Sequence, residues 1–191
     1  MEVFSYWDYK HPLEHTWTLW YLDGNKTKSW AECLMEVGSF GTVEDFWCLF
    51  NHIKPVSHLK GGCDYSLFKK GIRPMWEDEA NKNGGRWILN VDKKTSHQRL
   101  DHYWLELVLN MIGECFHGLN DKINGATINI RSKGNKIGLW TRDSENGQHE
   151  IIGIGMKLKE LIGYPPHEII SYQVHTDALH NSGTGKYKYY V

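Results

Sequence analysis

The 191-residue sequence lacks several features that mark large classes of protein. Its four cysteines, Cys33, Cys48, Cys63 and Cys115, include no Cys-x-x-Cys pair, so we expect reduced, mostly buried thiols and no metal site. No apolar run is long enough to cross a bilayer, and no signal peptide or lipid anchor is recognisable. We therefore expect a protein of the cytoplasm, with the nucleus as a second location, and no membrane partner.

A surplus of positive charge is absent as well. The chain has 22 Lys and Arg against 23 Asp and Glu, a formal net charge of −1. Proteins that coat nucleic acid without specificity need a broad basic field, so any RNA binding here must be local. The length fits one domain whose core needs neither disulfides nor metals.

Tryptophan, in contrast, is abundant, with nine residues. Trp30, Trp76 and Trp140 lie among charged or small polar residues, and Trp76 is followed directly by Glu77. An indole outside the core is a stacking surface for a flat or cationic ligand, and an adjacent carboxylate can bind the edge of a base. Most tryptophans nevertheless belong to cores, and we expect core positions for Trp17, Trp20, Trp87 and Trp104.

The patterning predicts an α+β fold: a curved antiparallel sheet of about eight strands with three helices on its convex face. The helices are expected at 43–52, after a Thr42 N-cap, at 100–115 and at 153–162. The strands that the pattern places are 16–22, 86–91, 126–131, 136–141 and 187–191. The helix at 100–115 carries a second apolar stripe, Leu105, Leu109 and Ile112, which suggests a partner surface.

Two of these strands, 126–131 and 136–141, are joined by a short polar turn. If Arg131 pairs opposite Lys136, both cations and Trp140 project from one side of the sheet. Like charges placed directly opposite destabilise a sheet unless an anion joins them. This pairing would therefore favour a phosphate site.

Ordered sequence blocks make the chain resemble the eukaryotic translation initiation factor 4E family, which binds the 7-methylguanosine cap of messenger RNA. The blocks are His-Pro-Leu (11–13), Thr-Val-Glu-Asp-Phe-Trp (42–47), Asn-His-Ile (51–53), Gly-Cys-Asp-Tyr-Ser-Leu-Phe-Lys (62–69), Pro-Met-Trp-Glu-Asp-Glu (74–79), Gly-Gly-Arg-Trp (84–87), Trp-Leu-Glu (104–106) and Trp-Thr (140–141). The resemblance begins at His11. It implies a single cap-binding domain at 11–191 and a flexible N-terminal extension at 1–10, with no cofactor.

The resemblance also implies a cap site on the concave face. Trp30 and Trp76 match the two stacking positions, Glu77 the carboxylate on guanine, and Trp140 the residue that packs on the N7-methyl group. Arg131 and Lys136 match the cations that hold the triphosphate. Further candidates near the cap are Arg86, Asn129 and Lys133.

On the back of the sheet, the resemblance implies a surface for the scaffold factor 4G and for 4E-binding proteins with a Tyr-x4-Leu-hydrophobic motif. The matching residues are His11, Pro12, Val43, Trp47, Leu105, Glu106, Leu109 and Ile112. Thr184 best matches the position of a phosphorylated serine in the family.

Two other functions remain open at this stage. A cap-processing enzyme is disfavoured, because the sequence has no Arg-Glu-x-x-Glu-Glu box, no Gly-x-Gly-x-x-Gly loop and no Walker lysine. A cap-binding translational repressor, or an isoform that engages factor 4G weakly, is the closer alternative. Such relatives often replace the first stacking Trp, and Trp30 favours the initiation type.

Overall fold

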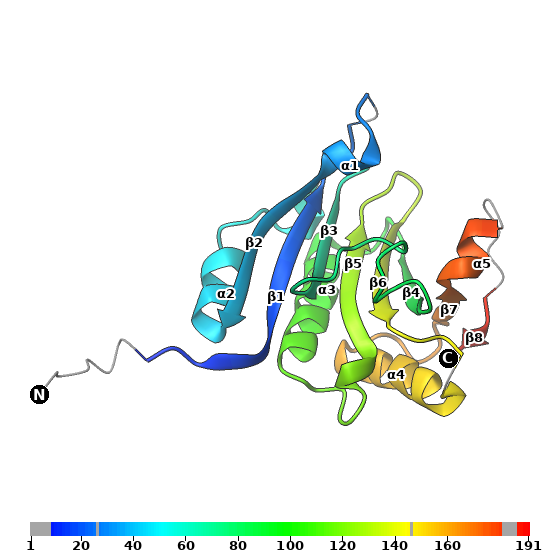
Figure 1. Cartoon of the computed structure of the whole chain (residues 1–191). Helices are drawn as coiled ribbons and strands as arrows, with labels where there is room; N and C mark the ends of the chain where they lie inside the picture. Colours follow the sequence, from blue (N-terminus) through cyan, green and yellow to red (C-terminus); the bar gives the residue numbers. More distant parts are fainter. Residues whose placement is uncertain (1–8, 26, 146, 181–186) are drawn as a thin grey trace, which may run out of the picture.

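The computed structural model describes residues 9–25, 27–145, 147–180 and 187–191 (Figure 1). Within them, eight strands form one antiparallel sheet in the order β2-β1-β3-β5-β6-β4-β7-β8, which confirms the expected class. The strands are β1 (Pro12–Leu22), β2 (Leu34–Thr42), β3 (Asp64–Lys69), β4 (Gly85–Val91), β5 (Ile123–Asn129), β6 (Asn135–Thr141), β7 (Ser171–Val174) and β8 (Tyr189–Tyr190). Thr184 and nearly all of the expected extension at 1–10 lie outside the described residues.

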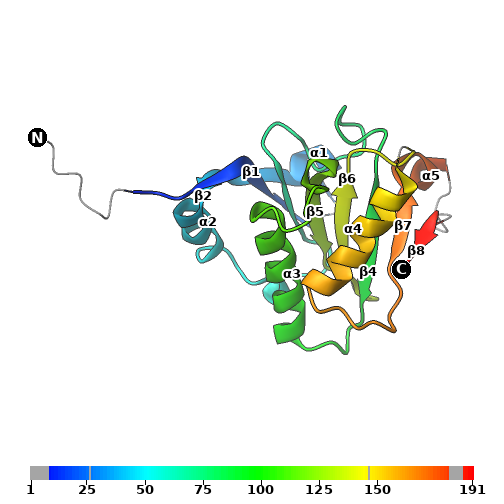
Figure 2. The same cartoon turned by 90° about the horizontal axis from the view of Figure 1, so that it is seen from below.

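Three helices, α2 (Val43–Phe50), α3 (His97–Ile112) and α4 (Gln148–Leu161), cover one face of the sheet, as expected (Figure 2). Helix α4 begins five residues before the predicted start, directly after Gly147, whose φ of 90° is accessible to glycine. Two short helices were not predicted: α1 (Trp30–Cys33), between β1 and β2, and α5 (His175–His180), after β7. In Figure 1, α1 lies at the end of β1 and β2, and α5 lies beside β7.

The core fills the space between the sheet and helices α2, α3 and α4. Trp17, Trp87 and Trp104 are at most 1% exposed, as predicted. The indole of Trp87 donates a hydrogen bond of 2.9 Å to the carbonyl of Ile151 in α4. A Cβ on Gly155 would come within 2.5 Å of the Trp87 ring, so this glycine lets α4 approach the sheet closely.

Trp20 is an exception to the core prediction. It is only half-buried, whereas its neighbours Trp17 and Leu19 in β1 belong to the core. Alternation along a strand places Trp20 on the opposite face of the sheet from Trp17, away from the helices. The core prediction for Trp20 is therefore wrong, because it ignored this alternation.

The four cysteines are free thiols. Cys33 and Cys63 are buried, Cys115 is partly buried and Cys48 is exposed, so the prediction of mostly buried thiols holds for only part of the set. The phenol of Tyr21 donates a hydrogen bond of 3.1 Å to Cys63 Sγ. Among the described helices, none is both long and apolar enough to span a membrane.

Candidate functional site

Trp30 is the first residue of α1 and is 45% exposed. Ser29 and Glu32 form a capping box around it: the backbone N–H of Ser29 donates to Glu32 Oε2 at 2.8 Å, and the Ser29 hydroxyl donates to the same oxygen at 2.6 Å. These hydrogen bonds lower the pKa of Glu32. The buried Cys33 closes the helix, and its carbonyl accepts the N–H of Asp23 at 3.0 Å. This short helix therefore presents an indole to solvent in a defined direction.

Trp76 and Glu77 lie in the loop between β3 and β4, which crosses in front of β5 and β6 in Figure 1. Asp78 clamps this loop, because its two carboxylate oxygens each accept a backbone N–H at 3.0 Å, from Arg73 and from Ala80. A loop closed on itself in this way can hold a partly buried indole next to an exposed carboxylate.

A second set of hydrogen bonds ties the same loop to the sheet. The side-chain amide of Asn81, which is 0% exposed, donates to the carbonyls of Arg73 and Met75 at 2.9 Å each. Asn124 of β5 donates to the carbonyl of Ala80 at 2.7 Å and to Asn81 Oδ1 at 2.9 Å. Buried amides with several partners fix a unique backbone conformation. The segment that carries Trp76 is therefore anchored on β5.

Trp140 forms the floor of the site and is 6% exposed. Its ring lies 4.3 Å from that of His175 and 5.4 Å from that of Phe68, between centroids. Its Nε1 donates a long hydrogen bond of 3.4 Å to Thr127 Oγ1. The guanidinium of Arg86, in the neighbouring strand, lies 5.9 Å from the centroid of the Trp140 ring. His175, Phe68 and Thr127 therefore fix the position of the Trp140 indole.

His175 is 3% exposed, and its Nε2 is buried without a hydrogen-bond partner among the described residues. Burial, and secondly the charge of Arg86, lowers the pKa of His175 to about 3. The ring is therefore neutral at physiological pH. Arg86 in turn donates to Gln173 Oε1 at 3.0 Å, which keeps its charge beside the floor.

These groups line one pocket of about 520 Å³, made by Trp30, Pro74, Met75, Trp76, Glu77, Arg86, Trp140 and His175. We call it the slot. The structure thus brings together five residues predicted for the cap site: Trp30, Trp76, Glu77, Arg86 and Trp140. Sequence reasoning missed His175, Pro74 and Met75. Pro74 and Met75 belong to the matched block at 74–79, whereas no local pattern singles out His175.

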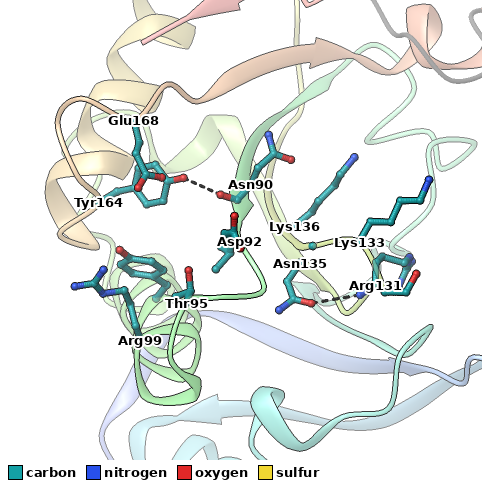
Figure 3. Close-up of a pocket in the computed structure, with 14 residues that line it drawn as sticks. Asn90, Asp92, Thr95, Arg99, Arg131, Lys133, Asn135, Lys136, Tyr164 and Glu168 are labelled. Carbon is teal, nitrogen blue, oxygen red and sulfur yellow. Dashed lines mark hydrogen bonds between the residues drawn. The ribbon is translucent and has the colours of Figure 1, made fainter.

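The remaining predicted cap residues lie farther along the sheet. Arg131, Lys133 and Lys136 line a second pocket of about 730 Å³, the neighbour pocket (Figure 3). Asn129 pairs directly with Lys136 across β5 and β6. Lys136 and Trp140 stand on the same face of β6, so Lys136 links the slot face to the neighbour pocket, which also reaches Arg99 and Tyr103 of α3 on the helix side of the sheet.

The structure does not meet the condition that Arg131 pairs opposite Lys136. Asn129 occupies that place in the register, because β5 ends there and residues 130–134 form the turn. Arg131 instead makes a two-pronged ion pair with the buried Asp64: Nη1 bonds Oδ1, and Nη2 donates to Oδ2 at 2.9 Å. This carboxylate raises the pKa of Arg131 further. The arginine is therefore oriented by a partner, and the sheet carries no directly opposed cations here.

The residues predicted for a partner surface lie on the other side of the molecule, where β1 begins and along α2 and α3. The N–H of Val43 donates to the carbonyl of His11 at 2.9 Å, and His11 Nδ1 lies 2.6 Å from Glu44 Oε1. This contact lowers the pKa of Glu44 to about 2. Val43 and Trp47 of α2 are 38% and 37% exposed.

Helix α3 contributes the rest of that surface. Leu105, Glu106 and Leu109 are partly exposed, whereas Ile112 is only 6% exposed and belongs to the core. The predicted second apolar stripe is therefore shorter than expected, because α3 turns Ile112 toward the sheet. Leu105 also lines a third pocket, of about 600 Å³, which it shares with Phe50 of α2.

Comparison with known proteins gives one consistent result. The family model described as eukaryotic initiation factor 4E matches residues 12–189. Eukaryotic translation initiation factor 4E-1A of Danio rerio is 49% identical over 192 residues, covering 100% of this chain and 89% of the relative.

Solved structures agree with the sequence comparison. A complex of C. elegans eIF4E-3 with the 4E-binding protein Mextli and a cap analogue has a TM-score of 0.88 and 45% identity, covering 96% of this chain and 100% of that one. Ascaris suum eIF4E-3 in complex with the m7G cap has a TM-score of 0.89 and 47% identity, covering 96% and 98%. Sequence, fold and the aromatic slot thus lead to one conclusion: the chain belongs to the eukaryotic initiation factor 4E family.

Proposed function

We propose that the chain binds the 7-methylguanosine cap of messenger RNA in the slot and recruits the scaffold factor 4G to start cap-dependent translation. The observation that carries this function is the convergence of Trp30, Trp76, Glu77 and Trp140 on one pocket of about 520 Å³. The proteins it resembles are initiation factors, and both of the similar structures described above hold a cap or cap analogue. The chain acts by binding and is not an enzyme.

The chemistry of the slot suits a methylated guanine. Methylation at N7 leaves a delocalised positive charge on the base, so the faces of Trp30 and Trp76 attract it by cation–π interaction as well as by stacking. The exposed carboxylate of Glu77 accepts the N1 and N2 protons of guanine, and the backbone N–H of Trp76 meets O6. Trp140 packs on the methyl group from the floor. Together these contacts recognise the positive charge of the methylated base and the hydrogen-bonding edge of guanine.

The triphosphate follows the sheet from the slot toward the neighbour pocket. Lys136 supplies a cation on the same face as Trp140, and Lys133 lies in the turn beside it. Arg131 is held toward this region by Asp64 and contributes hydrogen-bond donors in a fixed orientation. Asn129, opposite Lys136, adds an uncharged polar contact.

The outer surface made by α2 and α3 serves protein partners. Exposed Val43 and Trp47, with Leu105 and Leu109 beside them, suit the apolar face of an amphipathic helix with a Tyr-x4-Leu-hydrophobic motif. Factor 4G and the 4E-binding proteins carry this motif. The C. elegans relative in complex with Mextli supports the same use here.

Tryptophan fluorescence quenching by 7-methyl-GTP, compared with GTP, tests the proposed ligand. We expect the methylated nucleotide to bind about tenfold or more tightly, because only its base carries the charge that the indoles attract. Glu77→Ala should weaken 7-methyl-GTP binding, since it removes a charge-assisted pair of about 1.5–3 kcal/mol. Equal quenching by both nucleotides would contradict a cap function.

A peptide from factor 4G and one from an inhibitory 4E-binding protein separate the initiation factor from a repressor. The exposed Trp47 and Val43 favour binding of both peptides. Failure of the 4G peptide to bind, with cap binding intact, would favour the repressor.

We also propose that the protein works in the cytoplasm, where translation takes place, with a second pool in the nucleus. The four free thiols are consistent with a reducing compartment. Imaging of a fluorescent fusion checks the location, and secretion of the fusion would contradict it.

A further inference from the structure

The edge of the sheet beyond the slot carries an exposed aromatic residue to which the cap function gives no role. Tyr190 lies in β8, the last strand in the sheet order, and is 59% exposed. Its ring makes a T-shaped contact with that of Tyr187, with 6.0 Å between the centroids. A single exposed aromatic residue is common on protein surfaces, so the position of Tyr190 relative to the slot is the informative feature.

Tyr190 points to the face of the sheet that carries the slot. Its neighbour Tyr189 packs against the core, with 5.9 Å between the ring centroids of Tyr189 and Tyr172. Because successive side chains of a strand point to opposite faces, Tyr190 faces away from the core. Trp140 does so as well, since it alternates with the core residue Leu139. The two rings therefore stand on the same face.

The pairing of the strands places Tyr190 in the row of residues next to the floor of the slot. The row that contains the floor runs directly across three strands and consists of Trp140, Arg86 and Gln173. The adjacent row runs across four strands and consists of Gly138, Ile88, Ser171 and Tyr190. From β6 to β8 there are three strand spacings, which correspond to about 14 Å at roughly 4.8 Å each.

Arg86 links this edge to the slot. Its guanidinium lies 5.9 Å from the centroid of the Trp140 ring and donates to Gln173 Oε1 at 3.0 Å. Burial lowers the pKa of Arg86, and the phenol of Tyr187 acts in the opposite direction, which places Tyr187 within electrostatic range of the guanidinium. Trp140, Arg86, Tyr187 and Tyr190 are therefore successive neighbours from the floor of the slot to the edge of the sheet.

The chemistry of this edge suits a nucleobase. Proteins bind single strands with aromatic rings on which bases stack and with cations that follow the phosphates. The cation proposed for the triphosphate, Lys136, lies two residues from Gly138 and so in the row next to that of Tyr190. A T-shaped contact covers at most one face of the Tyr190 ring, which agrees with its exposure. The other face can accept a base.

We propose that Tyr190 is a stacking platform for a base among the first nucleotides after the cap, and that Tyr187 orients its ring. The inference rests on the proposed cap function and extends it from the methylated guanine to the RNA that follows. Stacking tolerates any sequence, because every base has an aromatic face, and it needs no charge on the ligand. The platform therefore adds affinity for capped RNA without adding dependence on salt.

The test compares three ligands: 7-methyl-GTP, a capped pentaribonucleotide, and the same capped chain with abasic residues after the cap. In Tyr190→Ala, affinity for the capped pentaribonucleotide should fall about five- to tenfold, the lower part of the range for base–aromatic stacking. Affinity for the other two ligands should not change, because neither places a base on Tyr190. The dependence of capped-RNA binding on salt should also stay that of the wild type, since no phosphate contact is lost.

Two further variants separate the aromatic ring from other causes. Tyr190→Phe should bind the capped pentaribonucleotide as the wild type does, because it keeps the stacking face. Tyr9→Ala is the matched control. Tyr9 is 75% exposed and makes a T-shaped contact with His11 at 5.7 Å between centroids, but it lies outside the slot, ahead of β1. This variant should bind all three ligands with wild-type affinity.

Several results overturn the proposal while the cap function stands. One is unchanged affinity of Tyr190→Ala for capped RNA, and another is an equal loss for 7-methyl-GTP, which would make Tyr190 a structural support of the slot. A loss in Tyr190→Phe as large as in Tyr190→Ala, or wild-type protein that binds the abasic chain as tightly as the intact one, also contradicts stacking. Weaker binding of a 4E-binding peptide alone would assign this edge to a protein partner. If the wild type did not respond to 7-methyl-GTP at all, the proposed function would fail, and this extension with it.

Discussion

Among single residues, the indoles of the slot differ in how firmly they are held. Trp30 is 45% exposed at the start of a four-residue helix, whereas Trp140 is 6% exposed and packed against His175 and Phe68. An exposed indole can stack on a ligand at little cost to the fold, while a buried one sets the depth of the pocket. Substitutions at Trp30 and Trp76 therefore report on binding more cleanly than substitutions at Trp140.

Replacing either stacking residue should weaken the cap complex. Trp30→Ala and Trp76→Ala should each cost about 1–3 kcal/mol of binding free energy, because each removes one face of the stack. Isothermal titration calorimetry with 7-methyl-GTP is the measurement, since the variants lose a fluorescent probe. Trp47→Ala, at an exposed tryptophan outside the slot, is the matched control. Normal cap affinity in both slot variants would contradict the assignment.

The pKa of His175 predicts a pH-dependent stability. Its folded value of about 3 lies below the ordinary value of 6.5, so the unfolded chain takes up a proton at a pH where the folded chain does not. Stability from this residue is therefore complete above pH 6.5 and decreases as the pH falls toward 3, by about 1–2 kcal/mol between pH 7 and pH 5. Urea unfolding of wild type and His175→Gln across this range is the measurement. Equal pH dependence in the two proteins would show that His175 does not carry the effect.

Among the elements, the slot depends on two segments that would not be stable alone. A four-residue helix such as α1 is far below the length at which isolated helices form. The loop that carries Trp76 has no regular structure, and its shape comes from Asp78, Asn81 and Asn124. The binding geometry therefore rests on side-chain hydrogen bonds as much as on strands.

Asn124→Ala should loosen the Trp76 loop from the sheet. It removes two donors, which leaves the carbonyl of Ala80 and Oδ1 of Asn81 without their partner. We expect the free energy of unfolding to fall by about 1–3 kcal/mol, with weaker 7-methyl-GTP binding. Faster hydrogen exchange of the amides at 73–81 would distinguish loosening of the loop from general destabilisation. Asn83→Ala, at an exposed asparagine, should change none of these quantities.

The sequence predicted the elements whose patterns are local. Thr42 caps α2 as expected, accepting the N–H of Asp45 at 3.2 Å, and the apolar period of α3 places Trp104 in the core. The pattern did not identify β3, because five of its six residues are buried and no alternation marks them. Strand β2 was missed as well; it is a largely exposed edge strand that contains two glycines.

For the site, family resemblance identified residues whose positions depend on contacts distant in sequence. The meeting of Trp30 with Trp76 in one pocket could not come from spacing, since a helix cap and a clamped loop bring them together. Arg131 and Asp64 are 67 residues apart in the sequence, and their ion pair orients Arg131. The possibility that Arg131 lies opposite Lys136 did not take this contact into account. Contacts of this kind leave no local signature in one sequence.

At the scale of the whole molecule, one sheet separates two binding surfaces. Helices α2, α3 and α4 cover one face of the sheet (Figures 1 and 2). The slot lies on the other face, because its residues Arg86 and Trp140 alternate with the core residues Trp87 and Leu139, and the partner surface lies on α2 and α3 themselves. One continuous cluster of buried apolar residues lies between them. Binding at one surface can therefore be changed without disturbing the other.

Substitutions on the two surfaces should act independently. Val43→Ala or Trp47→Ala should weaken a Tyr-x4-Leu-hydrophobic peptide by about 1–3 kcal/mol and leave 7-methyl-GTP binding unchanged. In the double variant Trp47→Ala/Trp76→Ala, the losses of the single variants should persist within about 0.5 kcal/mol for each ligand. Calorimetric titration of both ligands against the four proteins is the measurement. A larger deviation would reveal coupling through the core.

The short helix that carries Trp30 also bears on how the slot accepts purines of different bulk. The capping box of this helix is local to Ser29 and Glu32, and the helix is tied to the end of β1 by the bond from the Asp23 N–H to the Cys33 carbonyl, whereas the Trp76 loop is secured to β5 by buried amides. Extra methyl groups on the exocyclic amine of the base should therefore be accommodated by a displacement of the Trp30 side, while the opposite wall keeps its place. We expect a bulkier base to widen the slot by displacing Trp30, while Trp76 stays in place.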